Sequence, residues 1–501
     1  MQGRFISRPY FAVSSLMLIA LSIAPAVADN STDDNLIIGG KRDWTLTIGG
    51  DGTFDRGLDV AADAEGNVYV TGIFGSSVDF DPGPGSSRLT ADLSFFLGKY
   101  SPTGQLKWVR SWEGADMNVA ASLAVDKSGN VFVAGWFHGS DVDLDPTPAQ
   151  NLATAIQTKA FVSKFDSNGN FRWVKIWGGD WWARAYDIDI DPSGNLLVSG
   201  CFGGNADLNP GDAVEEREAL GRLDSFLSKL NSEGELLWVH TWGGTGGEGI
   251  ENDTAYGVRS TSDGYYYVTG GYNQSPDFDP GPERDIHSSM GLTDACLIKF
   301  DSDGSFVWSR AWGGSRDDYG AAVDIDAEGN VYSTGIFAGN VDFKPGRAQV
   351  VERGPNERSA YLVKYTPDGE FLWVRNWGTV GEFEHLALSV NDRGQAFVTG
   401  RFSLSGNLTG IVPVEVFSSP ELLRVVLCGF DAGGNFLMVC PLEVYGPAHG
   451  RGVSADKNGL VYVTGMYDHT VDFDPEFGWQ NIDERLTSGN MDIFLMKFTL
   501  E

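Results

Sequence analysis

The sequence predicts an all-β fold, a seven-bladed β-propeller built from four-stranded antiparallel blades. Three observations lead to this prediction. One short motif recurs seven times along the chain, each unit contains four apolar stretches of strand length, and an N-terminal stretch supplies the strand that the last unit lacks. A repeat at a fixed period outweighs any local pattern as an indicator of architecture.

The recurring motif is Gly-Asn-Val-Tyr-Val-Thr-Gly at Gly66–Gly72. Degenerate copies recur roughly every 65 residues, a period typical of repeat proteins. These copies begin at Gly129, Gly194, Gly264, Gly329, Gly394 and Gly459.

Each unit contains four stretches that are rich in Val, Tyr, Phe and Trp and are bounded by Gly, Pro, Asp or Ser, as strands are. In the first unit they are Gly57–Ala62, Asn67–Phe74, Phe95–Tyr100 and Leu106–Trp112. The connections Asp63–Gly66 and Ser101–Gly104 are predicted to be tight turns.

The second strand carries no charge on either face, because Val68 and Val70 alternate with Tyr69 and Thr71. A sheet that is covered on both faces has this pattern, and a propeller blade is covered by its two neighbours. A β-helix is the competing repeat fold. Its coils are much shorter than these units, and they lack two antiparallel turns per unit.

The last unit ends with its third strand, Phe494–Phe498. The stretch Trp44–Gly50 matches the fourth strands, such as Trp108–Gly114, in its spacing. We therefore expect this N-terminal stretch to complete the last blade and to close the ring, which removes open sheet edges. The predicted blades are 51–114, 115–179, 180–244, 245–314, 315–379, 380–444, and 445–498 with 41–50.

Residues 1–28 read as a cleavable secretory signal peptide. Arg4 and Arg8 precede an apolar run from Tyr10 to Ala24, and cleavage is predicted after Ala28. A membrane anchor is the alternative, but the run is shorter than the ~20 residues that a span needs. Residues 29–40 are expected to be a flexible segment before the single propeller domain, residues 41–498. The predicted location is secreted or periplasmic, with no membrane span.

The formal net charge of −32 disfavours nucleic acid and anionic lipid as partners. It favours divalent cations or cationic partners, although solubility alone also explains such a surface. An extracellular or periplasmic protein, or a polysaccharide, is the expected partner, and the protein is expected to be a monomer.

An acidic loop follows the second strand in most units and reads Val78-Asp-Phe-Asp-Pro-Gly83 in the first. Since this loop and the inter-blade loop lie at the same end of a propeller, these carboxylates should gather on one face. They could bind Ca²⁺ through oxygen ligands, or they could hydrogen-bond turn amides while the central Phe packs between blades. Because the loop recurs in most units, the turn-forming role is favoured over Ca²⁺ binding. The candidate metal ligands are Asp79, Asp81, Asp143, Asp145, Asp277, Asp279, Asp472 and Asp474.

Residues that break the repeat are the other candidates. Trp181 and Trp182 could stack on a sugar or pack between blades, and His385 lies beside Glu382 and Glu384. A histidine near glutamate is more often a surface pair than a general base. No zinc spacing, nucleophile elbow or phosphate loop is present, so we predict no catalytic residue and no cofactor other than Ca²⁺.

Two further patterns leave alternatives open. Asp187, Asp189 and Asp191, like Asp324 and Asp326, lie at alternate positions of a first strand, where they could bind a metal or, as we expect, line a wet channel. Cys428 and Cys440 flank one hairpin and are expected on opposite faces, so a disulfide between them would need a bulge; Cys201 and Cys296 have no evident partner.

The pattern Gly-Asn-Val-Tyr-Val-Thr-Gly, Phe-Leu-x-Lys-Tyr, Gly-x-Leu-x-Trp-Val-Arg resembles the bacterial β-propeller repeats called SBBP repeats. The resemblance covers residues 41–498, and unit six departs from it with Met438 and Leu442 in place of Trp. It implies a secreted propeller and no set of catalytic residues. We therefore expect an exported, non-enzymatic binding module with an acidic loop face. The alternatives are a secreted polysaccharide lyase or hydrolase with its site in the channel, and a lectin-like carbohydrate binder.

Overall fold

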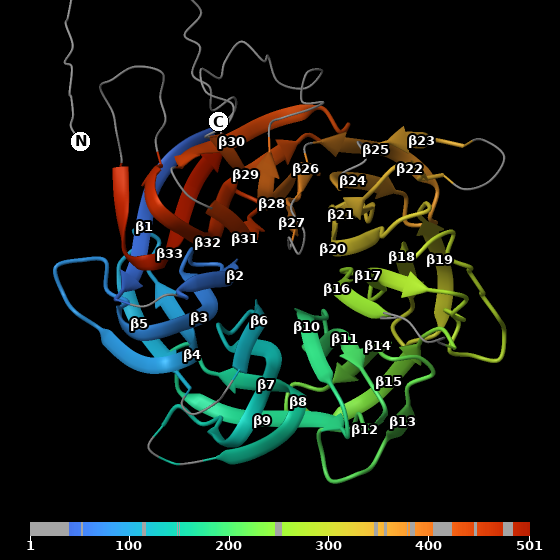
Figure 1. The fold of residues 1–501 in the computed structure, drawn as a ribbon, viewed down its shortest axis with the longest axis horizontal. Coiled ribbons are helices and arrows are strands. Elements are labelled where there is room, and N and C mark those ends of the chain that lie inside the picture. Colours follow the sequence, from blue (N-terminus) through green and yellow to red (C-terminus); the bar gives the residue numbers. More distant parts are fainter. Residues whose placement is uncertain are drawn as a thin grey trace, which may run out of the picture. The chain divides into compact units, whose positions relative to one another are not determined.

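A computed structural model describes residues 40–51, 54–112, 117–147, 149, 151–245, 253–344, 349–354, 358–377, 379–380, 386–403, 423–444, 448–473 and 484–500. All of them belong to one compact unit, Leu36–Glu501. The described residues form β-strands and turns, and no helix occurs among them (Figure 1). The predicted signal peptide lies outside the described residues.

Antiparallel pairing joins the strands in groups of four, each group in chain order. The first group is β2 (Arg56–Ala62), β3 (Val68–Asp79), β4 (Arg88–Tyr100) and β5 (Leu106–Ser111). The second is β6 (Met117–Val125), β7 (Val131–Asp143), β8 (Leu152–Phe165) and β9 (Phe171–Gly179). The third is β10 (Ala183–Ile190), β11 (Leu196–Phe202), β14 (Asp224–Leu230) and β15 (Leu236–Trp242). The fourth is β16 (Thr254–Ser260), β17 (Tyr266–Asn273), β18 (Thr293–Phe300) and β19 (Phe306–Trp312).

The later groups repeat the same order. The fifth is β20 (Tyr319–Ile325), β21 (Val331–Phe337), β24 (Ser359–Tyr365) and β25 (Phe371–Trp377). The sixth is β27 (Ala387–Val390), β28 (Ala396–Ser403), β29 (Leu423–Phe430) and β30 (Phe436–Val444). The seventh is β31 (Ala448–Ala455), β32 (Leu460–Asp472), β33 (Glu484–Leu500) and β1 (Gly40–Gly50). Short strands outside the groups are β12 (Asn205–Asp207), β13 (Glu216–Glu218), β22 (Asn340–Asp342), β23 (Val351–Arg353) and β26 (Thr379–Val380).

The seventh group combines the two ends of the described chain. β1 lies antiparallel to β33, with Trp44 opposite Lys497 and Ile48 opposite Ile493 (Figure 1). This is the pairing that the Trp44–Gly50 spacing predicts.

Three groups are separate four-stranded sheets, whereas the others join into larger sheets. The joins arise where the end of a fourth strand pairs with the hairpin that follows the next group's second strand. Gly49 lies opposite Asp79, and Gly178 lies opposite Asp207. At Gly50 the approach is so close that a Cβ would collide with the Ser77 carbonyl, whereas Glu443 and Val444 make the equivalent pairing between the sixth and seventh groups. The second and third strands also extend beyond the predicted bounds, so the acidic loops are tips of long hairpins.

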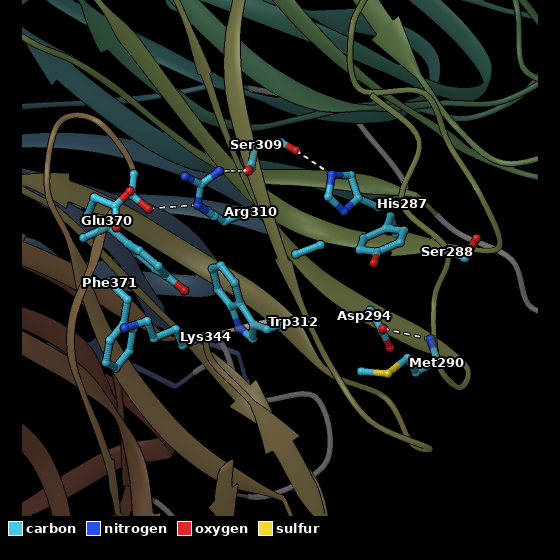
Figure 2. A pocket seen from close by; sticks show the side chains of 14 residues that line it. His287, Ser288, Met290, Asp294, Ser309, Arg310, Trp312, Lys344, Glu370 and Phe371 are labelled. Atoms are coloured by element: carbon cyan, nitrogen blue, oxygen red, sulfur yellow. Dashed lines mark hydrogen bonds between the residues drawn. The ribbon is translucent and has the colours of Figure 1, made fainter. Parts of the chain in front are cut away.

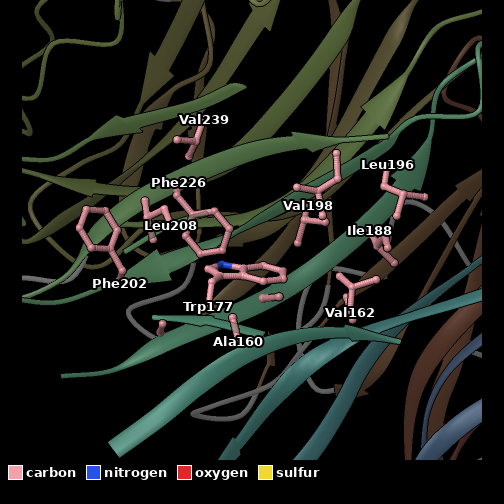
Figure 3. Close-up of a cluster of buried hydrophobic side chains, with 14 of the residues drawn as sticks. Ala160, Val162, Trp177, Ile188, Leu196, Val198, Phe202, Leu208, Phe226 and Val239 are labelled. Carbon is pink, nitrogen blue, oxygen red and sulfur yellow. The ribbon is translucent and has the colours of Figure 1, made fainter. Parts of the chain in front are cut away.

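Buried apolar clusters lie between consecutive groups. In one of them, Trp177 of β9 packs among Val198 and Phe226 of the third group, beside Val162 (Figure 3). An equivalent cluster contains Val60 and Phe74 of the first group together with Tyr462 and Ile493 of the seventh. The first strands also contact one another in the order β2, β6, β10, β16, β20, β27, β31 and again β2. The sheets therefore stabilise each other through their faces.

A polar contact recurs between consecutive groups. In the first, fourth, fifth and seventh groups a Lys and a Trp side chain donate to the same backbone carbonyl of the following group's second turn. Lys99 Nζ and Trp108 Nε1 donate to the carbonyl of Ser167, each at 3.3 Å. Lys497 and Trp44 do the same to Pro102, at 3.5 and 3.1 Å, and so connect the seventh group to the first. We call this arrangement the Lys–Trp clamp.

The four cysteines are buried, and none of them forms a disulfide with another. Cys428 belongs to the cluster between the fifth and sixth groups, and Cys440 to the cluster between the sixth and seventh. They therefore lie on opposite faces of the β29–β30 hairpin, as the sequence predicts, and no disulfide joins them.

Candidate functional site

The acidic loops are turns held by their own carboxylates. In five of them the first aspartate accepts hydrogen bonds from the amides two and eight residues further on; for Asp79 these come from Asp81 (3.2 Å) and Ser87 (2.8 Å). The second aspartate accepts from the amide two residues on, as Asp81 does from Gly83 at 2.8 Å. Phe80 between them is fully buried. The same first-aspartate contacts recur at Asp143, Asp207, Asp277 and Asp342, and the same second-aspartate contact at Asp145 and Asp279.

Asp79 illustrates the electrostatics of these loops. Burial raises its pKa, but hydrogen bonds from Ser86, Ser87 and Asp81 outweigh burial and hold the pKa below its ordinary value. Asp79 therefore stays ionised at neutral pH. Within the described part of the chain, no three His, Cys, Asp or Glu side chains come together as a metal site would require. Asp472 ends β32, and Asp474 lies outside the described residues.

Trp181 and Trp182 stack on each other at 5.7 Å between ring centroids. Both are half-buried, and both contact the Arg222 guanidinium, at 5.5 and 5.6 Å. Trp182 also lies under Arg184, at 4.8 Å, and donates its indole N–H to Gln157 of the preceding group at 3.0 Å. The ring and guanidinium contacts are stacking and cation–π contacts within the third group, and the Gln157 hydrogen bond joins it to the second. His385, with Glu382 and Glu384, lies outside the described residues.

The aspartates of the first strands have two environments. Asp187 accepts hydrogen bonds from the Val258 amide (2.9 Å) and the Ser122 hydroxyl (2.8 Å), so it links three groups. Arg259 lies 3.8 Å from Asp187 and 3.4 Å from Asp324. Burial lowers the pKa of Arg259, but the surrounding carboxylates outweigh it and raise that pKa.

Asp191 and Asp326 do not line a wet channel, which is where the sequence analysis places them. Asp191 is buried and pairs with Lys229 at 3.3 Å, while Asp326 pairs with Lys364 at 3.0 Å. Each also caps the turn that follows it, through amides two and four residues further on. The prediction of one wet face was wrong for these two residues, because β10 ends at Ile190 and β20 at Ile325, so each aspartate is the first residue of a turn and not a strand residue.

A surface groove of ≈ 540 Å³ lies between the fourth and fifth groups (Figure 2). Its walls come from β19, from the hairpin after β17, and from the turn before β25. Arg310 bridges the walls, since its Nε donates to the Gly369 carbonyl at 2.8 Å. Asp294 accepts from the Met290 amide at 2.9 Å, and burial raises the pKa of Asp294 to about 6.

Serine, histidine and aspartate meet in this groove, and their geometry decides what they can do. The Ser309 hydroxyl lies 2.9 Å from His287 Nε2 and donates to the Asp285 carboxylate. The same Nε2 lies 3.2 Å from Asp285. A catalytic relay needs the acid on one ring nitrogen and the hydroxyl on the other. Since one nitrogen meets both partners here, the arrangement is a hydrogen-bonded triangle and not a relay.

The sequence analysis missed this triangle. One signal could have found it, because the Trp-Val-Arg pattern of the fourth strands becomes Trp-Ser-Arg only at Ser309. Asp285 and His287 come from the return strand of the acidic hairpin, whose position depends on hairpin length. The local residue pattern does not indicate how long the hairpin is.

The fold and these sites define an all-β repeat protein of the β-propeller type. No protein-family model matches the chain. It is 23% identical over 505 residues to an uncharacterized WD repeat-containing protein of Acanthamoeba polyphaga mimivirus, an alignment that covers 85% of this chain and 36% of that protein. It is also 27% identical over 171 residues to the regulatory protein FlaEY of Caulobacter vibrioides, which covers 34% of this chain and 17% of that protein. The chain thus spans well under half the length of either relative.

Similar solved structures include the Mitotic Checkpoint Complex, at 7% identity and a TM-score of 0.43 over 89% of this chain and 95% of that chain. A protein of unknown function from Bacteroides caccae is 11% identical, with a TM-score of 0.34 over 77% of this chain and 94% of that chain. The SBBP resemblance stays a prediction. In the described residues no helix has the length and apolar character needed to cross a lipid bilayer.

Proposed function

We propose that this chain is an exported seven-bladed β-propeller, closed by β1, that works as a non-enzymatic module for binding another protein. Closure is supported by the β1–β33 pairing, by the cluster between the seventh and first groups, and by the Lys–Trp clamp on Pro102. A binding role is supported by the WD repeat-containing relative. Under this proposal residues 1–28 are a signal peptide that is removed after Ala28.

One observation carries the choice of binding surface. The segments that return from the acidic hairpins expose large apolar side chains, which a monomer rarely leaves open to water in number without a use. Ile156 is 84% exposed, Leu220 61% and Met290 64%. They follow the hairpins that carry Asp143, Asp207 and Asp277. Apolar anchors beside carboxylates suit a partner segment with both apolar and basic residues.

The alternatives have less support. The Ser309–His287–Asp285 triangle lacks the relay geometry that a hydrolase would use. A lectin-like role would use the faces of Trp181 and Trp182, yet those rings stack on each other and on arginines. Ca²⁺ at the Asp79 and Asp81 loops is compatible with a binding role, and we treat it as a separate hypothesis.

A peptide-display library panned on residues 29–501 tests the proposal. We expect enrichment of peptides that combine Lys or Arg with apolar residues. The enriched peptides should bind L220D and M290D variants at least about tenfold more weakly, a loss that corresponds to one buried apolar anchor.

The matched controls are L237D and L372D, which change exposed leucines of β15 and β25, 50% and 46% exposed, away from the acidic hairpins. They should bind the peptides like the unmodified protein. Enrichment of acidic peptides, or an equal loss in all four variants, would contradict the proposed surface. N-terminal sequencing of the exported protein tests cleavage after Ala28.

A further inference from the structure

A second cavity, of ≈ 440 Å³, lies where the first strands of all seven groups approach one another. In every group the residue two positions before the buried aliphatic of the first strand lines this cavity. These residues are Leu58, Ala121, Tyr186, Tyr256, Ala321, Leu386 and Arg451. The position is shared by all repeats, but its residue type is not. The repeat therefore builds the cavity, and the individual side chains decide what it can bind.

One side of the cavity is an aromatic wall. Trp136, Tyr186, Tyr256 and Tyr319 follow one another around it, at ring-centroid distances of 5.2, 5.2 and 5.8 Å. All four are half-buried and line the cavity. Such a wall favours the flat apolar face of a ring, either by stacking or by edge contacts.

The charged groups of the cavity are mainly cations, in a chain whose net charge is −32. Arg184, Arg259, Arg358 and Arg451 line it, and the single carboxylate of the lining is Asp187. Arg259 is neutralised by Asp187 and Asp324, and Arg358 lies 3.5 Å from Asp317.

Arg184 differs from Arg259 and Arg358. No described carboxylate lies within ion-pair distance of its guanidinium, and its Nε is buried without a hydrogen-bond partner. The guanidinium lies 5.3 Å over the Trp136 ring, at the start of the aromatic wall. A buried donor without a partner is unfavourable, so an anion that accepts from the guanidinium would be favoured.

We propose that this cavity binds a carboxylate carried on a six-membered ring. The ring would lie on the wall formed by Tyr186 and Tyr256, and the carboxylate would pair with Arg184, whose fork geometry suits bidentate contact. Both an acidic sugar and an aromatic acid have this chemistry. The inference does not depend on the hairpin surface proposed above, since it concerns different residues.

Calorimetric titration with glucuronate and with benzoate tests the inference, with glucose and benzyl alcohol as the neutral counterparts. We expect one of the two acids to bind at least about tenfold more tightly than its neutral counterpart, and the acid that binds identifies the source of the ring. R184Q should weaken that binding at least about tenfold, as loss of a charged pair does. R222Q is the matched control, because Arg222 also lies on tryptophan but does not line the cavity.

A second variant, Y256A, keeps the inference testable if R184Q does not fold. Y256A should weaken the acid without removing charge, and circular dichroism should show both variants folded. Failure of both acids to bind would overturn the inference. Equal affinity for acid and neutral ligand, or equal loss in R184Q and R222Q, would overturn it as well.

Discussion

At the scale of single residues, the described chain uses buried aspartates for two purposes. One set stays ionised because amides, asparagines or lysines satisfy it, as at Asp191 and Asp326. The other set is buried with few donors, as at Asp294, so its pKa rises. The sign of the pH dependence therefore differs between the sets.

The raised pKa of Asp294 predicts a pH-dependent loss of stability. Its folded pKa of about 6 exceeds the unfolded value, so its contribution is full below the unfolded pKa and is lost as pH rises through 6. Between pH 4 and pH 6 this costs on the order of 1–3 kcal/mol. In D294N the amide keeps an acceptor for the Met290 N–H, and the stability should depend less on pH across that window. Urea unfolding of both proteins at several pH values measures it. An equal slope in the two proteins would contradict the assignment.

The acidic loops allow a direct test of Ca²⁺. If Asp79 and Asp81 bind the ion, millimolar Ca²⁺ should raise the Tm more than Na⁺ at equal ionic strength does, because a ligand that binds only the folded state stabilises it. The D79N/D81N double variant should show a smaller increment. An identical Tm in EDTA and in calcium would mean that these carboxylates only accept hydrogen bonds from the turn amides.

At the scale of elements, the Lys–Trp clamp explains why unit six departs from the repeat. Its positions for Lys and Trp hold Gly429 and Met438. Where the clamp forms, it holds the turn between the third and fourth strands of the next group. In the seventh group these strands are β33 and β1, which come from opposite ends of the described chain, so no turn joins them. The sixth group therefore faces no such turn, and a Lys and a Trp at these positions would have no turn carbonyl to bind.

Removing one lysine of the clamp should destabilise the fold strongly. Lys364 lies 3.0 Å from the buried Asp326, so K364M would leave that carboxylate buried without its partner and lower the free energy of unfolding by about 3–5 kcal/mol. Burial raises the pKa of Asp326, but its partners hold it below the ordinary value, so the lost stability is present above the unfolded pKa and disappears as pH falls. The deficit of K364M should thus shrink toward pH 3. The exposed Lys127 supplies a control, since K127M should change stability by less than about 0.5 kcal/mol.

At the scale of the whole molecule, one strand connects the last group to the first. Ile48 of β1 is 1% exposed and belongs to the cluster that also contains Val60 of β2 and Tyr462 of β32. Loss of β1 would therefore open both a sheet edge and an apolar face.

Deleting residues 29–50 should lower the free energy of unfolding by at least about 3 kcal/mol, because Ile48 and its apolar neighbours lose their burial. Deletion of residues 29–39 is the control, since it leaves β1 intact. The Tm values of the two truncated proteins, measured by thermal unfolding, test this prediction. A Tm unchanged by the longer deletion would refute closure by β1.

The sequence by itself determined the strand content, the repeat period and the pairing of β1 with β33. These depend on local patterns, such as turn residues at fixed offsets and the Trp spacing shared by Trp44 and Trp108. It also indicated the acidic loops and the opposite faces of Cys428 and Cys440.

Only the tertiary structure decided the contacts between repeats. The Ser309–His287 contact, the Arg259 carboxylate cluster and the aromatic wall beside Arg184 each join residues of different strands, and most join different groups. The end of β10 at Ile190 also places Asp191 in a turn, where it pairs with Lys229 and does not line the predicted channel face. Such contacts follow from how sheets pack and how far hairpins extend. A periodic pattern specifies which residues are equivalent between repeats, but it does not specify which residues of different repeats meet.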